Sequence, residues 1–454
     1  MARNELAVSV TLPIAAMLIA TGDALSAGNA DNLIPALMSL QRWTPFFWGN
    51  SARVGSLVPA LAMPIQGPVA NWVAQCTLTA FAGLACFALI PRYVLGGDTW
   101  KTTGPIAACL WLLSVSRHVL AGWLIPGQPY GVGIALGLAA LLVGEAGERR
   151  RDGGGVLGGG AYRWQWRCAG ALLLVLAFWV HSGLGIVLLP LWAARRLLVL
   201  FLERDDEGAD PWAWAAPMLV GALQASWLVY YAASDTEPRY LGHVALRAIP
   251  GAISTALSSS LLEVGIVWVL VLAAVVVGTL QVPAILMDSP RPILAPLTLA
   301  GASLASAVPV VLNAWVDANQ HSARYYMGSM VVATCAVAAM IPALEARWKV
   351  GFALALPLLA LLRFGGGTIV SVRTQLAAMA PFAAQADGMG CTALSGDYWS
   401  IWPEVLGVLE ARHQRGETLP VYGLTDRGEA TLDLARAVPG DRLRVCRLGA
   451  AAKR

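Results

Sequence analysis

Apolar segments separated by short polar connections run from Asn4 to Gly365 and dominate this chain of 454 residues. About eleven of them approach the length that a helix needs to cross the roughly 30 Å hydrocarbon core of a bilayer. A backbone inside that core must satisfy its own hydrogen bonds, so we predict a bundle of membrane-spanning helices. The predicted spans are residues 6–21, 69–90, 105–124, 131–147, 167–180, 184–202, 212–232, 264–286, 293–315, 325–344 and 350–364.

The composition excludes an ordinary soluble protein. Charged residues make up 13% of the chain and the mean hydropathy is +0.63, whereas soluble proteins carry about 25% charged residues. The net charge of +4 comes from basic residues that are spread over many loops. Because these residues form no basic stripe, we do not expect nucleic acid as a partner. The apolar composition makes the lipid bilayer the expected partner.

The basic residues also predict the orientation of the chain. With the N-terminus inside, 14 Lys and Arg residues fall in cytoplasmic positions and six fall in outer connections. This is the distribution that the positive-inside rule requires. An odd number of spans then places the C-terminus outside. We expect a multi-pass protein of the bacterial inner membrane with a cytoplasmic N-terminus.

The pattern changes after Gly365-Gly-Gly367 to that of a small mixed α/β unit. We therefore expect an all-α polytopic membrane domain over residues 1–367, with an outer loop at 23–66, and an extracytoplasmic α/β domain over 368–454. Within the second domain the expected helices are 368–386 and 404–412, and the expected strands are 419–424 and 442–448.

The seven cysteines divide into two groups. Cys391 and Cys446 lie in the C-terminal domain, where an oxidising compartment would let them form a disulfide. The alternative is two unpaired thiols in a cytoplasmic domain. The remaining five fall inside predicted spans and are expected to pack as small apolar residues: Cys76, Cys86, Cys109, Cys168 and Cys335.

Two carboxylates follow the first apolar segment. Asp23 and Asp31 leave the predicted bilayer with no basic residue between them, and acids at a membrane surface are candidates for function. Asp31 would also make a good helix N-cap. Residues 31–41 are amphipathic and are expected to lie along the outer interface. Residues 6–20 also resemble a signal peptide, whose removal after Ala27 would take Asp23 with it.

Several cationic and ionisable groups share the predicted outer side or the membrane depth. Arg53 and Arg324 can pair with a phosphate, although Arg324 could equally anchor a span at the interface. Arg117 and His118 lie in the outer half of a span, and His181 lies at an apolar turn. A packing role for each histidine is the alternative. The histidines are scattered and no metal site is expected.

His181-Ser-Gly183 interrupts one long apolar block. The interruption favours two short helices that turn near the outer face, and a single kinked helix is the alternative. No inverted pair of interrupted segments is visible, which counts against a secondary transporter.

The layout and several motifs resemble bacterial members of the GT-C superfamily of integral-membrane glycosyltransferases. The likeness lies in the first span with its acidic loop and in five further stretches. These are Phe47-Trp-Gly-Asn-Ser-Ala-Arg53 with the residues up to 61, Gly127-Gln-Pro-Tyr130, Phe178-Trp-Val-His-Ser182, Ala323-Arg-Tyr-Tyr326 and Asp397-Tyr-Trp-Ser-Ile-Trp-Pro403.

The resemblance implies inverting transfer of a sugar from a polyprenyl-phosphate carrier to a glycan, lipid or protein acceptor outside the cytoplasm. In that family a loop-one acid is the base, and the matching positions are Asp31 and Asp23. The two stand eight positions apart, whereas many members have adjacent acids. Arg324 and Tyr325 lie in the late motif near the expected lipid phosphate. No cofactor is implied beyond the lipid-linked donor, and dependence on a divalent metal stays open.

Two other classes share these features. A transporter or flippase for a lipid-linked sugar would need similar arginines without bond chemistry. A non-catalytic scaffold could use Asp397-Tyr-Trp399 to recognise a partner, although core packing of these aromatic residues is the alternative.

Overall fold

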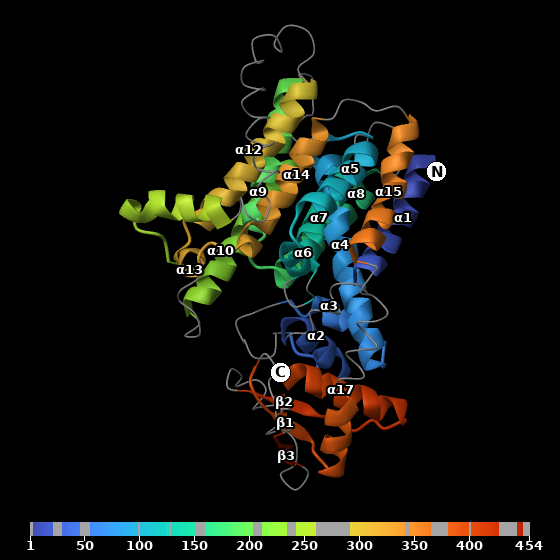
Figure 1. Cartoon of the computed structure of the whole chain (residues 1–454). Helices are drawn as coiled ribbons and strands as arrows, with labels where there is room; N and C mark the ends of the chain where they lie inside the picture. The colour runs from blue at the N-terminus through green and yellow to red at the C-terminus, as the bar shows by residue number, and fades with distance from the viewer. Residues whose placement is uncertain are drawn as a thin grey trace. The chain divides into compact units, whose positions relative to one another are not determined.

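The structure is a computed structural model that describes residues 3–20, 30–45, 55–98, 100–124, 126, 129–149, 159–202, 211–233, 242–259, 291–340, 346–364, 380–398, 401–425 and 443–447. The chain forms two compact units, each considered by itself (Figure 1). Unit 1 comprises residues 1–15, 81–123 and 130–360, and unit 2 comprises 16–80, 124–129 and 361–454. The predicted domain boundary at 367 lies outside the described residues.

Unit 1 is built from helices. It contains the first part of α1 (Arg3–Ile19), the second half of α4 (Pro68–Leu95) and most of α15 (Ala346–Phe364). Its other elements are α5 (Trp100–Ser114), α6 (Arg117–Leu124), α7 (Tyr130–Arg149), α8 (Gly159–Val180), α9 (Gly185–Leu202), α10 (Pro211–Ala233), η3 (Leu246–Ala248), α12 (Arg291–Val311), α13 (Ala314–Ala318), η4 (Ala323–Tyr326) and α14 (Met327–Ala339). Residues 249–259 are also helical.

Helix α14 is the core element of unit 1. Ten of its 13 residues are buried, and it packs against α5, α7 and α12. Small residues allow this close packing: a Cβ atom on Gly328 would lie 2.7 Å from Val187 of α9. Ser303 of α12 donates a hydrogen bond to the carbonyl of Ser329 at 2.8 Å. The small and mostly apolar residues of α14 thus suit a helix that is buried on most of its surface.

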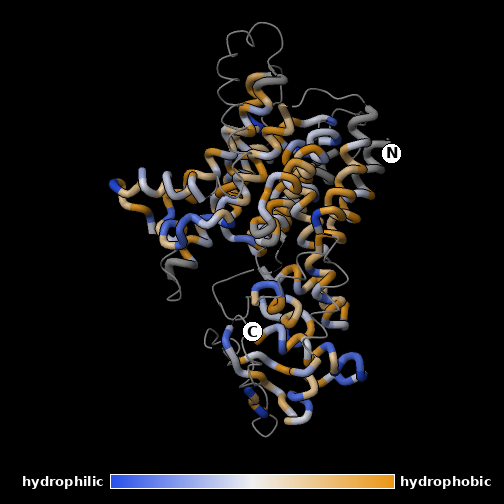
Figure 2. Tube along the Cα trace, viewed as in Figure 1, coloured by the Kyte–Doolittle hydropathy of each residue, from blue (hydrophilic) through white to orange (hydrophobic). Residues whose placement is uncertain are grey.

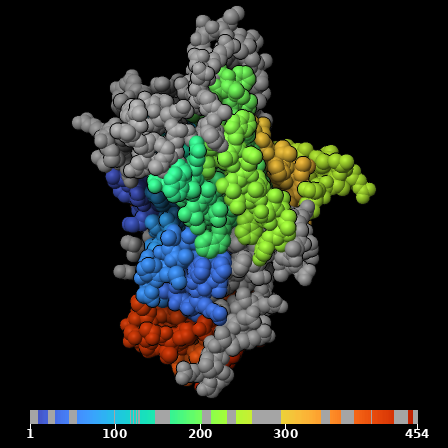
Figure 3. All heavy atoms as spheres, turned by 180° about the vertical axis from the view of Figure 1, so that it is seen from behind, coloured from blue at the N-terminus to red at the C-terminus, as the bar shows by residue number. Residues whose placement is uncertain are grey.

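Large apolar side chains on other helices face outward. Leu200, Met218 and Val229 are 72%, 70% and 69% exposed. Figure 2 shows apolar residues along the helices of unit 1, and Figure 3 shows α8 beside α10 on one such face. Apolar surface of this extent needs a non-aqueous environment. The chain is a helical membrane protein.

Among the described residues, three helical segments are long and apolar enough to cross a bilayer: Pro68–Leu95, Trp212–Tyr230 and Leu294–Val311. Four shorter apolar helices accompany them: Val10–Ile19, Tyr130–Ala146, Trp164–Val180 and Gly351–Arg363. The predicted span at 264–286 lies outside the described residues. Eleven spans therefore stays a prediction.

Local capping divides two predicted spans. The segment 105–124 is not one helix, because α5 ends at Ser114 and Ser116 Oγ accepts the amide of Val119 at 3.2 Å to start α6. The segment 293–315 likewise divides into α12 and α13, where Asn313 is the N-cap of α13. The predicted turn at His181 is confirmed, since α8 ends at Val180 and α9 begins at Gly185.

Unit 2 combines early and late parts of the chain. The early part contains α2 (Ala30–Leu40), α3 (Leu57–Ala62) and the first half of α4. The late part contains a helix over residues 380–388 and α17 (Ile401–Gln414). Its strands β1 (Ala393–Ser395), β2 (Tyr422–Leu424) and β3 (Val445–Cys446) form a parallel sheet in the order β2-β1-β3.

The α/β pattern of the late part agrees with the prediction, with different bounds. The strands expected at 419–424 and 442–448 are shorter, and β1 was not expected. Trp402 of α17 is fully buried, and a Cβ atom on Gly423 of β2 would lie 2.6 Å from its ring. Gly416, with φ of +75°, ends α17 while the amide of Glu417 bonds the carbonyl of Arg412 at 2.9 Å.

A disulfide joins Cys391, next to β1, to Cys446 of β3, with a Cα–Cα separation of 5.8 Å. Of the five other cysteines, Cys76, Cys86, Cys109 and Cys335 are buried as expected. Cys168 is exposed on α8, so its predicted packing role is wrong.

Replacing Gly83 of α4 by Ala should lower the melting temperature of the purified protein. A Cβ atom there would overlap the indole of Trp123, while Gly131 of α7 also lies against Gly83. Overpacking of this kind costs on the order of 1–3 kcal/mol. Gly221→Ala on α10 is the matched control, because no atom lies within 4 Å of its Cβ position. Equal melting temperatures for the two variants would contradict this packing.

Candidate functional site

Asp31 lies in the first turn of α2 and is half-buried. Helix α2 begins at Ala30, so Asp31 is inside the helix and is not its N-cap. The eight residues that follow, from Asn32 to Ser39, are all buried. Helix α2 is therefore a core helix of unit 2, and the location of residues 31–41 at the membrane interface stays a prediction.

A polar network holds α2 to α4. Ser39 Oγ donates to Asn71 Oδ1 at 2.8 Å, and Gln75 Nε2 donates to Asn71 Oδ1 at 2.7 Å and to the carbonyl of Pro35 at 3.1 Å. Asn71 Nδ2 donates to the carbonyls of Ala62 and Ile65, both at 2.9 Å. Asn71 therefore joins α2, α4 and the turn after α3 at one point.

The late part of unit 2 covers the other side of α2. Leu33 and Leu37 of α2 share an apolar core with Trp402 and Leu406 of α17 and with Cys391. Gln41 Nε2 donates to the carbonyl of Val421 at 2.8 Å. Helix α2 is thus packed between α4 and the C-terminal domain.

Helix α17 also contacts the start of α4. Glu410 Oε2 accepts the amide of Val69 at 3.1 Å, and Figure 3 shows this junction between the blue and red segments. An acid at the start of a helix satisfies an amide that has no partner within the helix. The C-terminal domain therefore contributes a cap to α4.

Arg412 organises the interior of the C-terminal domain. It is 4% exposed and donates to Asp387 at 3.0 Å, to the carbonyl of Cys391 at 2.8 Å and to that of Pro420 at 3.2 Å. Asp387 also accepts from Arg415 at the surface. These bonds compensate the desolvation of the guanidinium and fix the disulfide segment.

The pKa values of two acids, Glu404 in α17 and Glu417 just after it, are shifted. Burial raises the pKa of Glu404, in the first turn of α17. A hydrogen bond from Arg415 lowers the pKa of Glu417, which is exposed. Neither group lies beside Asp31 in the sequence or carries a predicted role, and both shifts are explained by their local surroundings.

In unit 1 the late motif brings Arg324 and Tyr325 together. Arg324 Nη2 donates to the Tyr325 hydroxyl at 2.7 Å, and its guanidinium carbon lies 4.8 Å from the centre of the tyrosine ring. Both side chains are half-buried. Because the phenol oxygen accepts from the arginine, the tyrosine proton can point to a further acceptor. The pair is suited to an anion such as a phosphate.

Directly beside this pair lies a buried histidine that bridges two oxygen groups. His321 is 0% exposed. Its Nδ1 lies 2.7 Å from the hydroxyl of Tyr326, and its Nε2 lies 3.1 Å from Oδ1 of Asp317. A neutral ring with its proton on Nε2 would donate to Asp317 and accept from Tyr326.

The backbone at this histidine is strained. Gln320 and His321 have φ of +54° and +49°, a region that costs a residue with a Cβ about 1–2 kcal/mol. The turn is held from several directions: the amide of His321 bonds the carbonyl of Val316, and Ser259 Oγ bonds the carbonyl of His321, both at 2.9 Å. Strain that persists under such constraint is a feature of functional segments.

His181 contacts another predicted motif. Its ring lies edge-on to Tyr130 at 4.7 Å, and the amide of Gly183 lies 3.5 Å from its Nδ1. Arg117 and His118 open α6. Asp23 and Arg53 lie outside the described residues.

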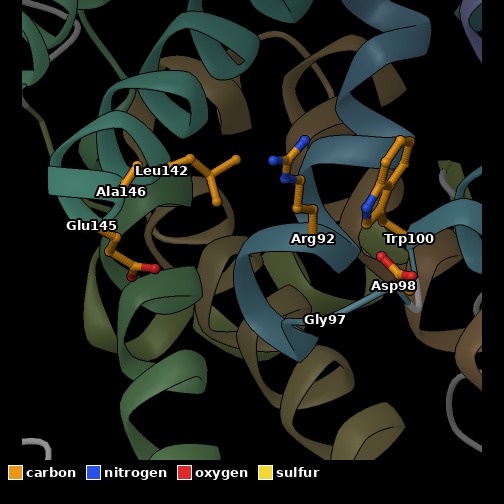
Figure 4. A pocket seen from close by; sticks show the side chains of 7 residues that line it. All are labelled: Arg92, Gly97, Asp98, Trp100, Leu142, Glu145 and Ala146. Atoms are coloured by element: carbon orange, nitrogen blue, oxygen red, sulfur yellow. The ribbon is translucent and has the colours of Figure 1, made fainter. Parts of the chain in front are cut away.

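A cavity of about 440 Å³ also lies in unit 1 (Figure 4). Arg92 of α4, Gly97 and Asp98 of the turn after it and Trp100 at the start of α5 line one part of the cavity. Leu142, Glu145 and Ala146 of α7 line another part. Arg92 lies 5.5 Å from the centre of the Trp100 ring. The lining has two acids and one arginine and contains none of the predicted site residues.

No group of three or more potential metal ligands occurs among the described residues. Dependence on a divalent metal therefore stays open.

No protein-family model and no curated protein matches the chain. Among solved structures, it is similar to the crystal structure of ArnT from Cupriavidus metallidurans bound to undecaprenyl phosphate. The two chains are 13% identical, 97% of this chain and 89% of that chain are covered, and the TM-score is 0.46. The ligand of that structure is a polyprenyl phosphate.

Sequence reasoning identified Arg324 and Tyr325 but not Asp317, His321 or Tyr326 as a group. A usable signal was present, because an acid and a histidine four residues apart share one face of a helical turn. The bond between His321 and Tyr326 could not be read from spacing, since it depends on the left-handed backbone at Gln320 and His321.

Asn71→Leu should destabilise unit 2. It would remove the acceptor of Ser39 and Gln75 and the donor to Ala62 and Ile65, all within a buried region. Each buried polar group that loses its partner costs roughly 1–3 kcal/mol. Thermal unfolding of the purified protein and the rate of trypsin cleavage between α2 and α4 measure the effect.

Gln66→Leu is the matched control for this network. Gln66 also donates to a backbone carbonyl, that of Met63, but it is exposed. It should leave both measurements close to wild type. A loss equal to that of Asn71→Leu would show that burial of the network does not matter.

Proposed function

We propose that this protein is a GT-C-type glycosyltransferase that moves a sugar from a polyprenyl-phosphate carrier to an extracytoplasmic acceptor, with Asp31 as the base. One observation carries the proposal: Asp31 is held at the start of a helix whose next eight residues are buried. A carboxylate on so short a helix is positioned by tertiary contacts. Such positioning is the main requirement of general base catalysis.

In this reaction Asp31 accepts the proton of the acceptor hydroxyl. The hydroxyl oxygen forms a bond to the anomeric carbon while the bond from that carbon to the phosphate oxygen breaks. The lipid phosphate leaves with the electron pair, and attack from the opposite side inverts the anomeric centre. Asp31 can do this because it is only half-buried, so a hydroxyl can reach it.

The Arg324–Tyr325 pair is assigned to the lipid phosphate. Its guanidinium and phenol supply cationic and neutral donors of fixed mutual geometry. These donors suit the charge that develops on the leaving phosphate. Arg53, Arg117, His118 and His181 remain proposed contributors, with His181 oriented by Tyr130. Asp23 remains a second candidate base.

Asp31→Asn should lower transfer by roughly 10²-fold or more, because it keeps the shape of the side chain and removes its basicity. The assay follows sugar transfer from a panel of polyprenyl-phosphate sugars in membranes, with melting temperature measured in parallel. Asp98→Asn is the control, since Asp98 is an exposed acid bonded to Lys101.

Unchanged transfer in both Asp31→Asn and Asp23→Asn would remove loop-one base catalysis. Movement of the intact lipid-linked sugar across the membrane, without release of polyprenyl phosphate, would instead identify a flippase. Absence of both reactions would favour a scaffold.

We further propose an inner-membrane protein whose N-terminus is cytoplasmic and whose C-terminal domain is extracytoplasmic. The Cys391–Cys446 disulfide supports this location, because such bonds persist in oxidising compartments. Alkaline phosphatase fused after Arg454 should be active, since it needs export. Activity of a cytoplasmic reporter at the same point, with an inactive phosphatase, would reverse the topology.

A further inference from the structure

The segment that contains Arg324 and Tyr325 is closed by a side-chain bond. His321 and Tyr326 lie on either side of it, and His321 Nδ1 lies 2.7 Å from the Tyr326 hydroxyl. We call residues 321–326 the bracket. Within the bracket, the amide of Tyr325 bonds the carbonyl of Ser322 at 3.1 Å. The His321–Tyr326 bond therefore joins the two ends of the segment that carries Arg324 and Tyr325.

The same histidine ties the bracket to its surroundings. Its other ring nitrogen bonds Asp317 of α13, and its carbonyl accepts from Ser259. Asn313 fixes the start of α13 by accepting the amides of Trp315 and Val316 at 2.9 and 3.2 Å. The bracket is thus anchored to a capped helix and to the helical segment 249–259.

Burial decides what His321 can do. The side chain has no exposed surface, and Tyr326 is 3% exposed. Neither group can touch a lipid or a sugar, whereas Arg324 and Tyr325 are half-exposed. We propose that His321, bonded to Asp317 and Tyr326, is a positioning residue that holds Arg324 and Tyr325 in the geometry that binds the phosphate of a polyprenyl-phosphate lipid.

This inference rests on the proposed function for the identity of the lipid, and on the contacts above for the positioning. The left-handed backbone at Gln320 and His321 supports it, because a strained turn needs side-chain bonds to keep one conformation. Loss of the Tyr326 hydroxyl would leave the fold of the helices intact and release the bracket. The expected effect is on binding geometry and not on assembly of unit 1.

The test uses the full-length protein in lipid nanodiscs with undecaprenyl phosphate as the probe. Tyr326→Phe removes the hydroxyl that His321 bonds. His321→Gln replaces the ring, whose two nitrogens bond Tyr326 and Asp317, by a single amide group. Both should weaken binding of undecaprenyl phosphate by roughly tenfold, the effect of misplaced donors, in protein that is still folded at the assay temperature. Undecaprenol, which lacks the phosphate, should bind all variants equally.

Tyr93→Phe is the matched control, because Tyr93 is another buried tyrosine of unit 1, on α4. It should leave binding of the phosphate lipid at the wild-type level. For a donor sugar found in the transfer assay, Tyr326→Phe should lower kcat/KM by a similar factor, while Tyr93→Phe should leave it within about twofold.

The outcomes separate the two proposals. Lower melting temperatures with wild-type phosphate-lipid binding would show a packing role only and overturn the positioning role, whatever the transfer assay gives. Weaker phosphate-lipid binding in a protein that transfers no sugar would keep the positioning role and overturn the glycosyltransferase. If the wild-type protein binds undecaprenyl phosphate no better than undecaprenol, the positioning proposal falls.

Discussion

The burial of α2 between α4 and the C-terminal domain is the contact on which unit 2 depends. An isolated helix of 11 residues is marginal in water, so α2 is helical because both of its faces are covered. Apolar residues such as Leu33 and Leu37 meet α17, and polar residues such as Ser39 meet Asn71. The position of Asp31 is consequently a property of the whole unit.

Each unit contains a network of buried hydrogen bonds. In unit 2 the buried amides of Asn71 and Gln75 join helices to one another. In unit 1, near the late motif, His321 bonds both Asp317 and Tyr326. The first network bonds α2, which carries Asp31, and the second lies next to Arg324 and Tyr325 in the chain. Satisfied buried networks confer rigidity and a unique conformation, which a reacting group needs.

Much of the helical bundle could be predicted, because apolar length and turn residues are local signals. The turn at His181 follows from three polar or small residues in an apolar block. The burial of α2 could not be predicted, because its partners Asn71 and Val421 are distant in the sequence. Its polar residues suggested an interface, whereas they bond within the protein. Strand β1 was missed since Ala393–Ser395 has no strand-like alternation, and its pairing with β2 and β3 defines it.

The assembly of unit 2 from residues 16–80 and 361–454 has a consequence for biosynthesis. Helix α2 emerges early from the ribosome, but the partners Trp402, Leu406 and Val421 are made last. Until then the apolar face of α2 lacks its partners in the C-terminal domain. Contacts between such distant segments also form slowly. Helix α2 can therefore reach its final packing only after the segments between its two sets of partners have been made. The surroundings of Asp31 are then complete only once the C-terminal domain has been made.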